Sequence, residues 1–436
     1  MQKEKHTHQP SLWRQLRQSR SAVFALTFLS VLIFLSLFAN IISNDLPLTC
    51  RYKNERVFPA LTPQKIDSSF NQTYQRWDLR AFRDINWRKE EVESVVWPLI
   101  PYGSQIQPRS HRLLSPFGKQ EVIAENGEKI ILKGFKRHLL GTTQNGQDVL
   151  AALLRGGRVS LSVGILVVLL SGIIGIFIGA AIGFWGDYGI QLKRGMIWMM
   201  IPALFLGWFY GFRVRRFILL DAFEESFSIG IPSLMISLMI VLAIFFVCYF
   251  AGKIISRYRY FNHTISFPLD SIVMRIIEIL KSMPTLLLII SVAAVLGRSL
   301  WVVMLILGLL SWTGVARLVR GEMLRVSRMG YIEAARAQGI PPMIILLRHA
   351  LPNAMPPVWV ALAFGVGGAI IAESSLSFLH LIEYEVTWGN LLSAARSNLD
   401  AWWIGVFPGL AIFFTVLSFN ILGERLRDLL DPRFNS

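Results

Sequence analysis

The chain has 436 residues, of which 53% are hydrophobic and only 17% are charged, and its mean hydropathy is +0.48. This composition is too apolar for an average soluble protein and predicts a polytopic membrane protein. The net charge of +16 is spread over the loops between apolar runs, whereas nucleic-acid binding requires a basic cluster on a polar domain. Two cysteines, and histidines without an HExxH spacing, predict neither a disulfide framework nor a metal site, and we expect no cofactor.

The chain opens with a basic segment, residues 1–20, followed by an apolar run at residues 21–42 that is long enough to span a bilayer. The positive-inside rule places this N-terminus in the cytoplasm. A signal peptide is the competing interpretation, but no small-residue cleavage site follows the run. We therefore expect residues 1–43 to form a cytoplasmic N-terminus and an uncleaved first span.

Residues 44–158 form the one long polar stretch, and we expect them to be an extracytoplasmic insert. Residues 120–123 and 129–132 predict a β-hairpin, and residues 148–156 predict a short interfacial helix. The many basic residues do not contradict this placement, because long loops cross the membrane largely regardless of charge. The permease-like part then begins at residue 159, with a span at residues 160–185.

That span carries glycines at small-residue spacing, namely Gly172, Gly175, Gly179 and Gly183, which favour close helix packing in lipid. Two further apolar runs, residues 196–212 and 229–250, predict a helical hairpin at about residues 191–262; the first run is short and is either re-entrant or little tilted. The flanks of the hairpin are basic and are expected in the cytoplasm. Later spans are predicted at residues 271–296, 300–316, 358–379 and 403–422, which makes about eight in an all-α protein.

The polar stretch at residues 330–357 separates two of these spans. Ala-rich residues 331–338 predict a helix, and Gly339 stands where a C-cap glycine ends it. Pro341 and Pro342 suit the first turn of a second helix, which we expect to end at Pro352. The pattern alone is more typical of an ordinary cytoplasmic loop.

The residues of this stretch resemble the EAA loop of ATP-binding-cassette importer permeases, in the form found in dipeptide and oligopeptide permeases. The resemblance implies a coupling loop at about residues 329–353 that docks into a groove on an ATPase subunit. The residues that carry it are Glu333, Ala334, Ala335, Gly339, His349, Leu351, Pro352 and Asn353.

A second resemblance lies before the second family span, where the family has a Gly-Thr segment. Here the matching residues are Gly141, Thr142, Gly146 and Asp148, whereas Thr143 and Gln147 replace the usual Asp and Arg.

Glu373 lies in a run, residues 372–379, that is similar to the family's Ala-Glu-x-Ser-Leu-Ser-Phe-Leu sequence. A carboxylate within a span is costly and so predicts a function. Glu373 either lines the pathway or holds two helices together. Residues 388–392 and the C-terminal tail also resemble family segments, whereas the 191–262 hairpin does not. Residues 43–48 are most similar to the oligopeptide and microcin C importer branch.

The resemblance implies six core spans plus the inserted pair, in a subunit that forms half of a translocation pathway for peptides. The implied partners are a second permease in a heterodimer, two cytoplasmic ATP-binding subunits and an extracytoplasmic substrate-binding protein. The implied location is a bacterial inner membrane with both termini cytoplasmic. The chain is not expected to be an enzyme, because it has no Walker A sequence for ATP hydrolysis.

Other classes of membrane protein predict different sequence patterns. A secondary transporter, or a channel-like protein without ATPase partners, remains the alternative, although we find no repeated halves with paired discontinuous helices. A membrane enzyme requires a cluster of nucleophile, base or metal ligands, which the sequence does not predict.

Overall fold

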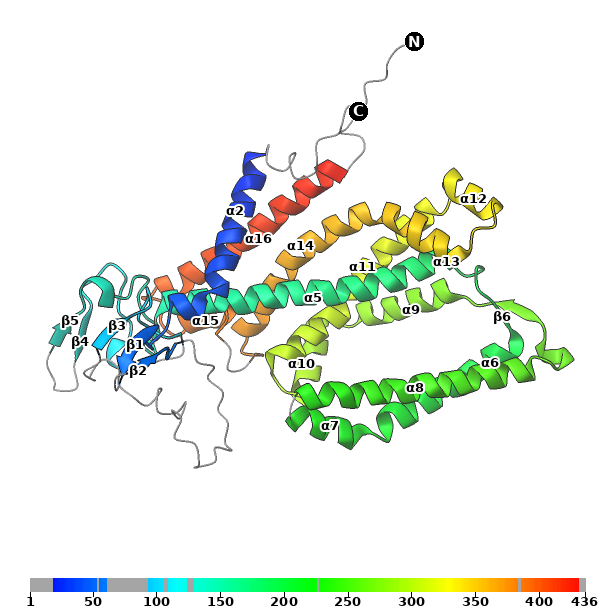
Figure 1. The fold of residues 1–436 in the computed structure, drawn as a ribbon, viewed down its shortest axis with the longest axis horizontal. Helices are drawn as coiled ribbons and strands as arrows, with labels where there is room; N and C mark the ends of the chain where they lie inside the picture. The colour runs from blue at the N-terminus through cyan, green and yellow to red at the C-terminus, as the bar shows by residue number, and fades with distance from the viewer. Residues whose placement is uncertain are drawn as a thin grey trace, which may run out of the picture. The chain divides into compact units, whose positions relative to one another are not determined.

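Long helices dominate the computed structural model in Figure 1. It describes residues 19–52, 55–60, 93–104, 109–123, 129–225, 227–382 and 386–430. The helices are α2 (Arg20–Leu37), α3 (Ala39–Ile42), α5 (Val149–Trp185), α6 (Arg194–Trp208), α7 (Arg216–Glu225), α8 (Phe227–Ile255), α9 (Leu269–Ser282), α10 (Thr285–Leu296), α11 (Leu300–Val326), α12 (Gly330–Ala337), α13 (Pro342–Ile344), α14 (Leu351–Phe378), α15 (Trp388–Ala395) and α16 (Trp403–Leu430). The strands are β1 (Thr49–Tyr52), β2 (Glu55–Val57), β3 (Glu93–Val96), β4 (Glu121–Ile123), β5 (Lys129–Ile131), β6 (Gln191–Lys193) and β7 (Thr264–Ser266).

Seven helices in the described ranges are long and apolar enough to cross a membrane, or eight if α9 and α10 count as one broken span. This confirms the all-α polytopic class and agrees with six core spans plus an inserted pair. Helices of this kind are apolar around most of their circumference, so hydropathy alone locates them.

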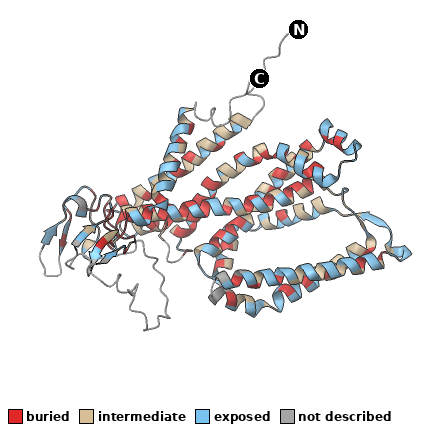
Figure 2. Ribbon diagram, in the orientation of Figure 1, coloured by how far each residue is buried: buried red, intermediate tan, exposed pale blue. Residues whose placement is uncertain are grey.

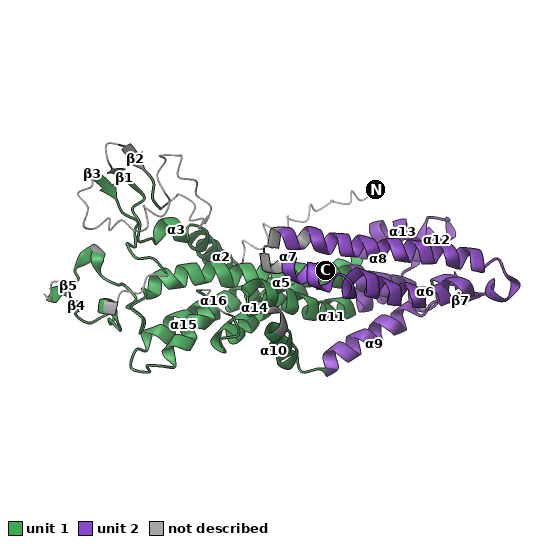
Figure 3. Cartoon of the chain, turned by 90° about the horizontal axis from the view of Figure 1, so that it is seen from below, with its two compact units in different colours: residues 1–176, 283–318, 352–436 green, residues 177–282, 319–351 purple. Residues whose placement is uncertain are grey.

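Two compact units make up the chain (Figure 3): unit 1 comprises residues 1–176, 283–318 and 352–436, and unit 2 comprises residues 177–282 and 319–351. The core of unit 1 is a cluster of aliphatic side chains from α5, α10, α11 and α14, including Val163, Ile289, Val303 and Leu376. In the same unit α16 packs against α2 and α15.

The polar segment before α5 contains short antiparallel strands. β1 pairs with β2 and β3, and β4 pairs with β5 in the register Val122↔Ile130, which confirms the predicted hairpin. The turn of that hairpin, residues 124–128, lies outside the described residues.

The expectation of a separate interfacial helix at residues 148–156 is wrong, because α5 runs unbroken from Val149 to Trp185. Gly156 and Gly157 do not interrupt it. A β-carbon on either glycine would lie 3.0 Å from the ring of the fully buried Trp388, so the two glycines make room for that side chain within one helix.

The glycines further along α5 pack against other helices, as predicted. An added β-carbon at Gly175 would lie 2.6 Å from Val315 of α11, and one at Gly172 would lie 3.2 Å from Leu362 of α14. Close approach of backbones is the use that lipid-embedded helices make of small residues.

Two later spans differ from the prediction. The span expected at residues 271–296 is divided into α9 and α10 around Met283 and Pro284, because proline has no N–H to continue the helix. Conversely, Pro352 does not end the second helix of the 330–357 stretch. A π turn at Ile345–Ala350 widens the helix just before that proline, and α14 continues to Phe378.

The inserted hairpin consists of α6, α7 and α8 in unit 2. α6 packs along α8, and the chain between them contains the helix α7. An antiparallel ribbon closes the base of the hairpin, with Leu192 of β6 opposite Ile265 of β7. Figure 2 shows that α8 is exposed over most of its surface.

We predict that Gly252→Ile separates α6 from α8. A β-carbon at Gly252 would lie 2.9 Å from the Cα atom of Met196, and a backbone atom cannot move aside cheaply. Overpacking of this kind costs about 1–3 kcal/mol, so the hairpin should become sensitive to protease at a lower temperature.

Gly207→Ala is the matched control, since its β-carbon would meet Val241 at an ordinary 3.4 Å. Equal protease resistance of Gly252→Ile and Gly207→Ala would contradict the packing described for α6 and α8.

Candidate functional site

The predicted coupling loop forms a helix, a glycine corner and a second helix. Gly339 has φ +74°, the left-handed conformation that favours glycine. Its N–H donates to the Arg336 carbonyl at 3.0 Å, and the Ile340 N–H donates to the Ala335 carbonyl at 3.2 Å, which closes the end of α12. Pro342 then occupies the first turn of α13, as predicted.

The loop has a buried side and an exposed side, and we call residues 330–344 the knob. Ile332 and Ala335 of α12 are buried. Glu333 and Gly339 are exposed, and a β-carbon at Gly339 would meet no atom within 4 Å. Glu333 lies in the first turn of α12, where a negative charge is favourable to the helix dipole. The knob therefore offers a preformed surface that unit 2 itself does not cover.

Ionic and aromatic contacts hold the elements of unit 2 around the knob. Arg320 of α11 binds both carboxylate oxygens of Asp270 at 2.5 Å, in the bidentate geometry that is strongest for this pair. The guanidinium of Arg336 lies 5.5 Å from the centre of the Phe184 ring, within the range of a cation–π contact.

Asp187 fixes the start of α9. Its carboxylate accepts hydrogen bonds from the Ser271 hydroxyl and the Ser271 N–H, at 2.5 and 2.8 Å. These bonds lower the pKa of Asp187, because they favour the charged form. Their contribution to stability is therefore complete above the pKa of the unfolded aspartate and is lost as the pH falls through the lowered pKa.

The remaining coupling-loop residues do not form a corner. His349 lies in the π turn, and Leu351, Pro352 and Asn353 form the first turn of α14. Pro352 and Asn353 are exposed, whereas His349 is half-buried. These residues therefore connect the knob to a span through continuous helix.

Glu373 lies in the middle of hydroxyl groups in unit 1. The Ser160 hydroxyl of α5 and the Ser377 hydroxyl of α14 each donate to its carboxylate at 2.7 Å, and Ser374 and Thr387 bond to it as well. The side chain is fully buried, and in the described part of the chain no basic side chain forms an ion pair with it. These hydrogen bonds link α5, α14 and the start of α15.

The Gly-Thr segment forms a compact turn in unit 1. Gly141 has φ +77°, and a β-carbon there would lie 2.6 Å from the Leu114 carbonyl oxygen and 2.8 Å from the indole nitrogen of Trp403. The Thr142 hydroxyl donates to the His111 carbonyl at 2.6 Å and accepts from the Leu114 N–H at 2.8 Å. Trp403 of α16 donates to the Thr142 carbonyl at 3.0 Å.

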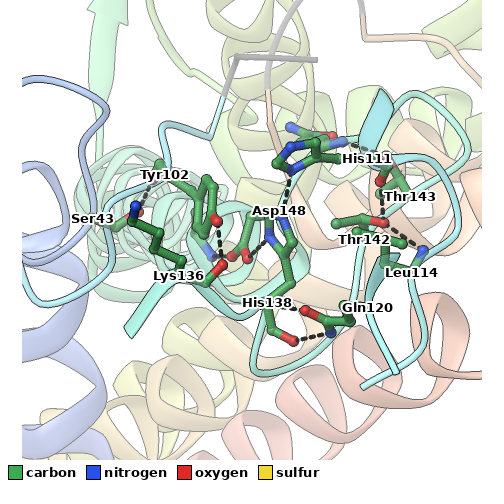
Figure 4. A network of polar contacts seen from close by, with 12 residues as sticks. Ser43, Tyr102, His111, Leu114, Gln120, Lys136, His138, Thr142, Thr143 and Asp148 are labelled. Atoms are coloured by element: carbon green, nitrogen blue, oxygen red, sulfur yellow. Dashed lines mark hydrogen bonds and ion pairs between the residues drawn. The ribbon is translucent and has the colours of Figure 1, made fainter. Parts of the chain in front are cut away.

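Asp148 links this turn to α5 and to a pair of histidines (Figure 4). One carboxylate oxygen accepts from the Ala151 N–H at 2.7 Å and so caps α5. The other lies 2.7 Å from Nδ1 of His138, whose Nε2 lies 2.8 Å from Nδ1 of His111. The Tyr102 ring stacks on His138 at 3.9 Å. The family segment thus anchors the polar insert to the end of a span.

Gly146 also takes a left-handed conformation, with φ +85°, and its N–H donates to the Thr143 carbonyl. The two residues that depart from the family pattern still make contacts: the Gln147 N–H donates to the Thr143 hydroxyl, and the Gln147 amide donates to the Ser104 carbonyl.

A cavity of about 350 Å³ lies in unit 1 between α5, α11 and α14. Its wall is mostly aliphatic side chains and glycine, and its polar side chains are Ser171 and Ser311. Ala372 contributes to the wall, whereas the neighbouring Glu373 bonds to the hydroxyl cluster instead. The cavity is therefore apolar and uncharged.

The predicted residues thus fall into three separate groups: the knob with its helical extension, the Gly-Thr turn, and Glu373. Sequence reasoning missed His138, Ser160 and Ser377 as functional contacts. Ser377 follows Glu373 by four residues, a spacing that brings side chains together on a helix, so it had a usable signal. Ser160 and His138 had none, because their partners lie far away in sequence or in irregular chain.

The comparisons with known proteins agree with this architecture. Residues 263–436 match the family model of the binding-protein-dependent transport system inner membrane component. Residues 11–55 match the model of the N-terminal TM domain of oligopeptide transport permease C. Glutathione transport system permease protein GsiD of Shigella flexneri serotype 5b is 44% identical over 167 residues, and its counterpart in Pectobacterium atrosepticum is 42% identical over 170 residues.

The chain is thus a multi-pass membrane protein that carries a transport-permease segment. Residues 263–436 are similar to the inner membrane components of binding-protein-dependent transport systems, and residues 11–55 are similar to the oligopeptide permease branch. The matches span 38% of this chain and 55–56% of the GsiD relatives' own length. The oligopeptide resemblance is confirmed, whereas the microcin C likeness stays a prediction.

We predict that Glu373→Ala lowers the thermal stability of the purified protein more than Glu373→Gln does. Alanine leaves the Ser160 and Ser377 hydroxyls buried without their acceptor, at a cost of about 1–3 kcal/mol for each unsatisfied group. Glutamine keeps one carbonyl oxygen in place. Ser375→Ala serves as the control, because its exposed hydroxyl bonds only to its own helix at Ile371. If Glu373→Ala melts like the wild type but alters transport, Glu373 lines the pathway and does not hold the helices together.

Proposed function

We propose that this chain is a transmembrane permease subunit of an ATP-driven importer for peptides or related compounds. The observation that carries the proposal is the exposed knob, with Gly339 at its corner, inside the segment that matches the family model. A rigid exposed corner next to spans suits docking to a cytoplasmic ATPase, since a preformed surface loses little conformational entropy on binding.

Coupling follows from chain continuity. Helical backbone extends from Pro342 to Phe378, and the α14 part of it supplies Ala361, Gly365 and Ala369 to the wall of the cavity. A displacement of the knob by an ATPase is therefore transmitted along a helix to the lining of the proposed pathway. The free energy comes from other subunits, because the chain has no Walker A sequence.

The proposed complex contains a second permease, two ATP-binding subunits and an extracytoplasmic binding protein. The relatives are named as glutathione transport permeases, which supports a small peptide-like substrate. The apolar, uncharged cavity wall with its two serine hydroxyls suits side chains and peptide groups better than an inorganic ion.

A secondary transporter is the second candidate, and the break between α9 and α10 is the observation that favours it. That class places discontinuous helices in two related halves, and the described ranges contain one such pair. Uptake driven by an ion gradient and unaffected by loss of the ATPases would support this candidate.

We predict that Gly339→Val and Glu333→Lys each weaken association with the ATPase subunits about tenfold or more. Valine takes up φ +74° only under strain, so the second helix of the knob is displaced. Lysine reverses the charge at an exposed docking position. Gly330→Val is the matched control, because it lies in the same knob with open space and without a positive φ. Wild-type ATPase binding and hydrolysis in both variants, measured in reconstituted membranes, would overturn the coupling role.

We further propose that the knob and both termini are cytoplasmic, whereas the polar insert before α5 is not. An impermeant maleimide added to intact cells should label Leu139→Cys, an exposed site of the insert, and should spare Gln338→Cys in the knob. Both variants carry Cys248→Ser to remove the partly exposed native thiol. Labelling of Gln338→Cys from outside would contradict this orientation.

A further inference from the structure

The base of the inserted hairpin carries a concentration of positive charge. Five basic residues lie at the ends of α6 and α8 next to the β6–β7 ribbon and in the turn between α8 and β7: Lys193, Arg194, Lys253, Arg257 and Arg259. We call these five residues the basic collar. All of them are exposed except Arg194, which is half-buried.

Backbone contacts hold the collar together. Lys193 pairs with Thr264 across the ribbon, and the Arg194 N–H donates to the His263 carbonyl at 2.9 Å. The Arg194 guanidinium lies 4.7 Å from the centre of the Tyr260 ring. Gly195 approaches Ser256 so closely that an added β-carbon would lie 2.7 Å from its hydroxyl, which brings the start of α6 against the end of α8. The cations therefore share one end of one hairpin.

The chain segments that carry the collar contain no acidic residue. Residues 188–220 and 226–269 contain no Asp or Glu, and the acids of the hairpin, such as Asp221, belong to α7 at its opposite end. Within the described chain, none of the five cations forms an ion pair. Asp187 and Asp270, the next acids along the chain, are engaged by Ser271 and Arg320.

The surfaces next to the collar are those of a membrane interface. Tyr258 is 70% exposed and Tyr260 is 63% exposed, and tyrosine favours the level of the lipid headgroups. Beyond them α8 exposes a continuous apolar surface that includes Phe246, Phe250 and Ile254. The collar is thus placed where the apolar part of a hairpin meets its polar end.

We propose that the basic collar binds the phosphate headgroups of anionic lipids and so anchors the hairpin to one leaflet. Clusters of four to eight Lys or Arg residues directly beside a membrane span are typical of sites for anionic lipid. Three of the five cations are arginines, whose planar guanidinium binds phosphate with two parallel hydrogen bonds. The unbalanced charge is complementary to such headgroups, and α8 supplies the apolar contact for their acyl chains.

The positive-inside rule alone also explains basic residues at the end of a span, but it makes a different prediction. Residues that act only during insertion have no preference for one lipid over another once the protein is folded. A headgroup site retains phosphatidylglycerol selectively over phosphatidylcholine, and that selectivity weakens as salt shortens the Debye length.

The test uses the full-length chain in detergent, titrated with short-chain phosphatidylglycerol or phosphatidylcholine while its melting temperature is followed. We expect phosphatidylglycerol to stabilise the wild type selectively. The triple variant Lys253→Gln, Arg257→Gln, Arg259→Gln should require at least about tenfold more of it, since three cations are removed and each cation near a membrane surface contributes roughly a fivefold factor.

Two variants provide controls. Arg213→Gln with Arg216→Gln removes exposed arginines from the other end of the hairpin and should leave the midpoint unchanged. Arg257→Lys with Arg259→Lys keeps the charge and should retain most of the binding. Native mass spectrometry of the same samples should show phosphatidylglycerol bound to the wild type and lost from the triple variant.

Several results would overturn the proposal. One is an unchanged phosphatidylglycerol midpoint in the triple variant, and another is equal stabilisation by inorganic phosphate, which would indicate a site for the free ion. Loss of ATPase association with unchanged lipid binding would assign the collar to a protein partner. If the triple variant fails to insert, the salt dependence of the wild type tests the proposal instead. A phosphatidylglycerol midpoint that does not rise with added potassium chloride excludes a headgroup site.

Discussion

Lipid offers no hydrogen-bond partner, so every polar group within a spanning helix must be satisfied by the protein itself. The structure meets this constraint in unit 1 at Glu373, whose carboxylate accepts from hydroxyls on α5 and α14. The cost of placing a carboxylate there is offset because each of its oxygens accepts a hydrogen bond. The Ser160–Glu373 hydrogen bond joins α5 to α14, two of the three helices that line the cavity.

The same constraint acts on the backbone where helices change character. Pro284 separates α9 from α10, and a π turn precedes Pro352 so that helix continues through it. Both features belong to the segment that matches the family of transport permeases. Helices bend at defined residues of this kind, at proline and at π turns.

Hydropathy was sufficient to predict the number of spans, because a helix in lipid is apolar on nearly all sides. Several helix ends were predicted wrongly. The rules that end helices at glycine and proline do not include the packing partners, or the π turn, that allow a helix to continue past these residues. Gly156 and Gly157 look like a break until Trp388 is seen to fill the space beside them. The corner at Gly339 was predictable from local rules, whereas the Ser160–Glu373 bond joins helices 213 positions apart and has no local signal.

The two ends of the inserted hairpin lie together. The Phe267 N–H donates to the Ile190 carbonyl at 2.8 Å, and the ribbon continues from there through β6 and β7. Directly before the ribbon, the Asp187 carboxylate accepts a hydrogen bond from the Ser271 N–H in the first turn of α9. Insertions whose ends lie together are tolerated in natural loops, because the entropic cost of closing a longer loop rises only slowly with its length. The hairpin therefore keeps an exposed apolar surface on α8 that is available for contacts of its own.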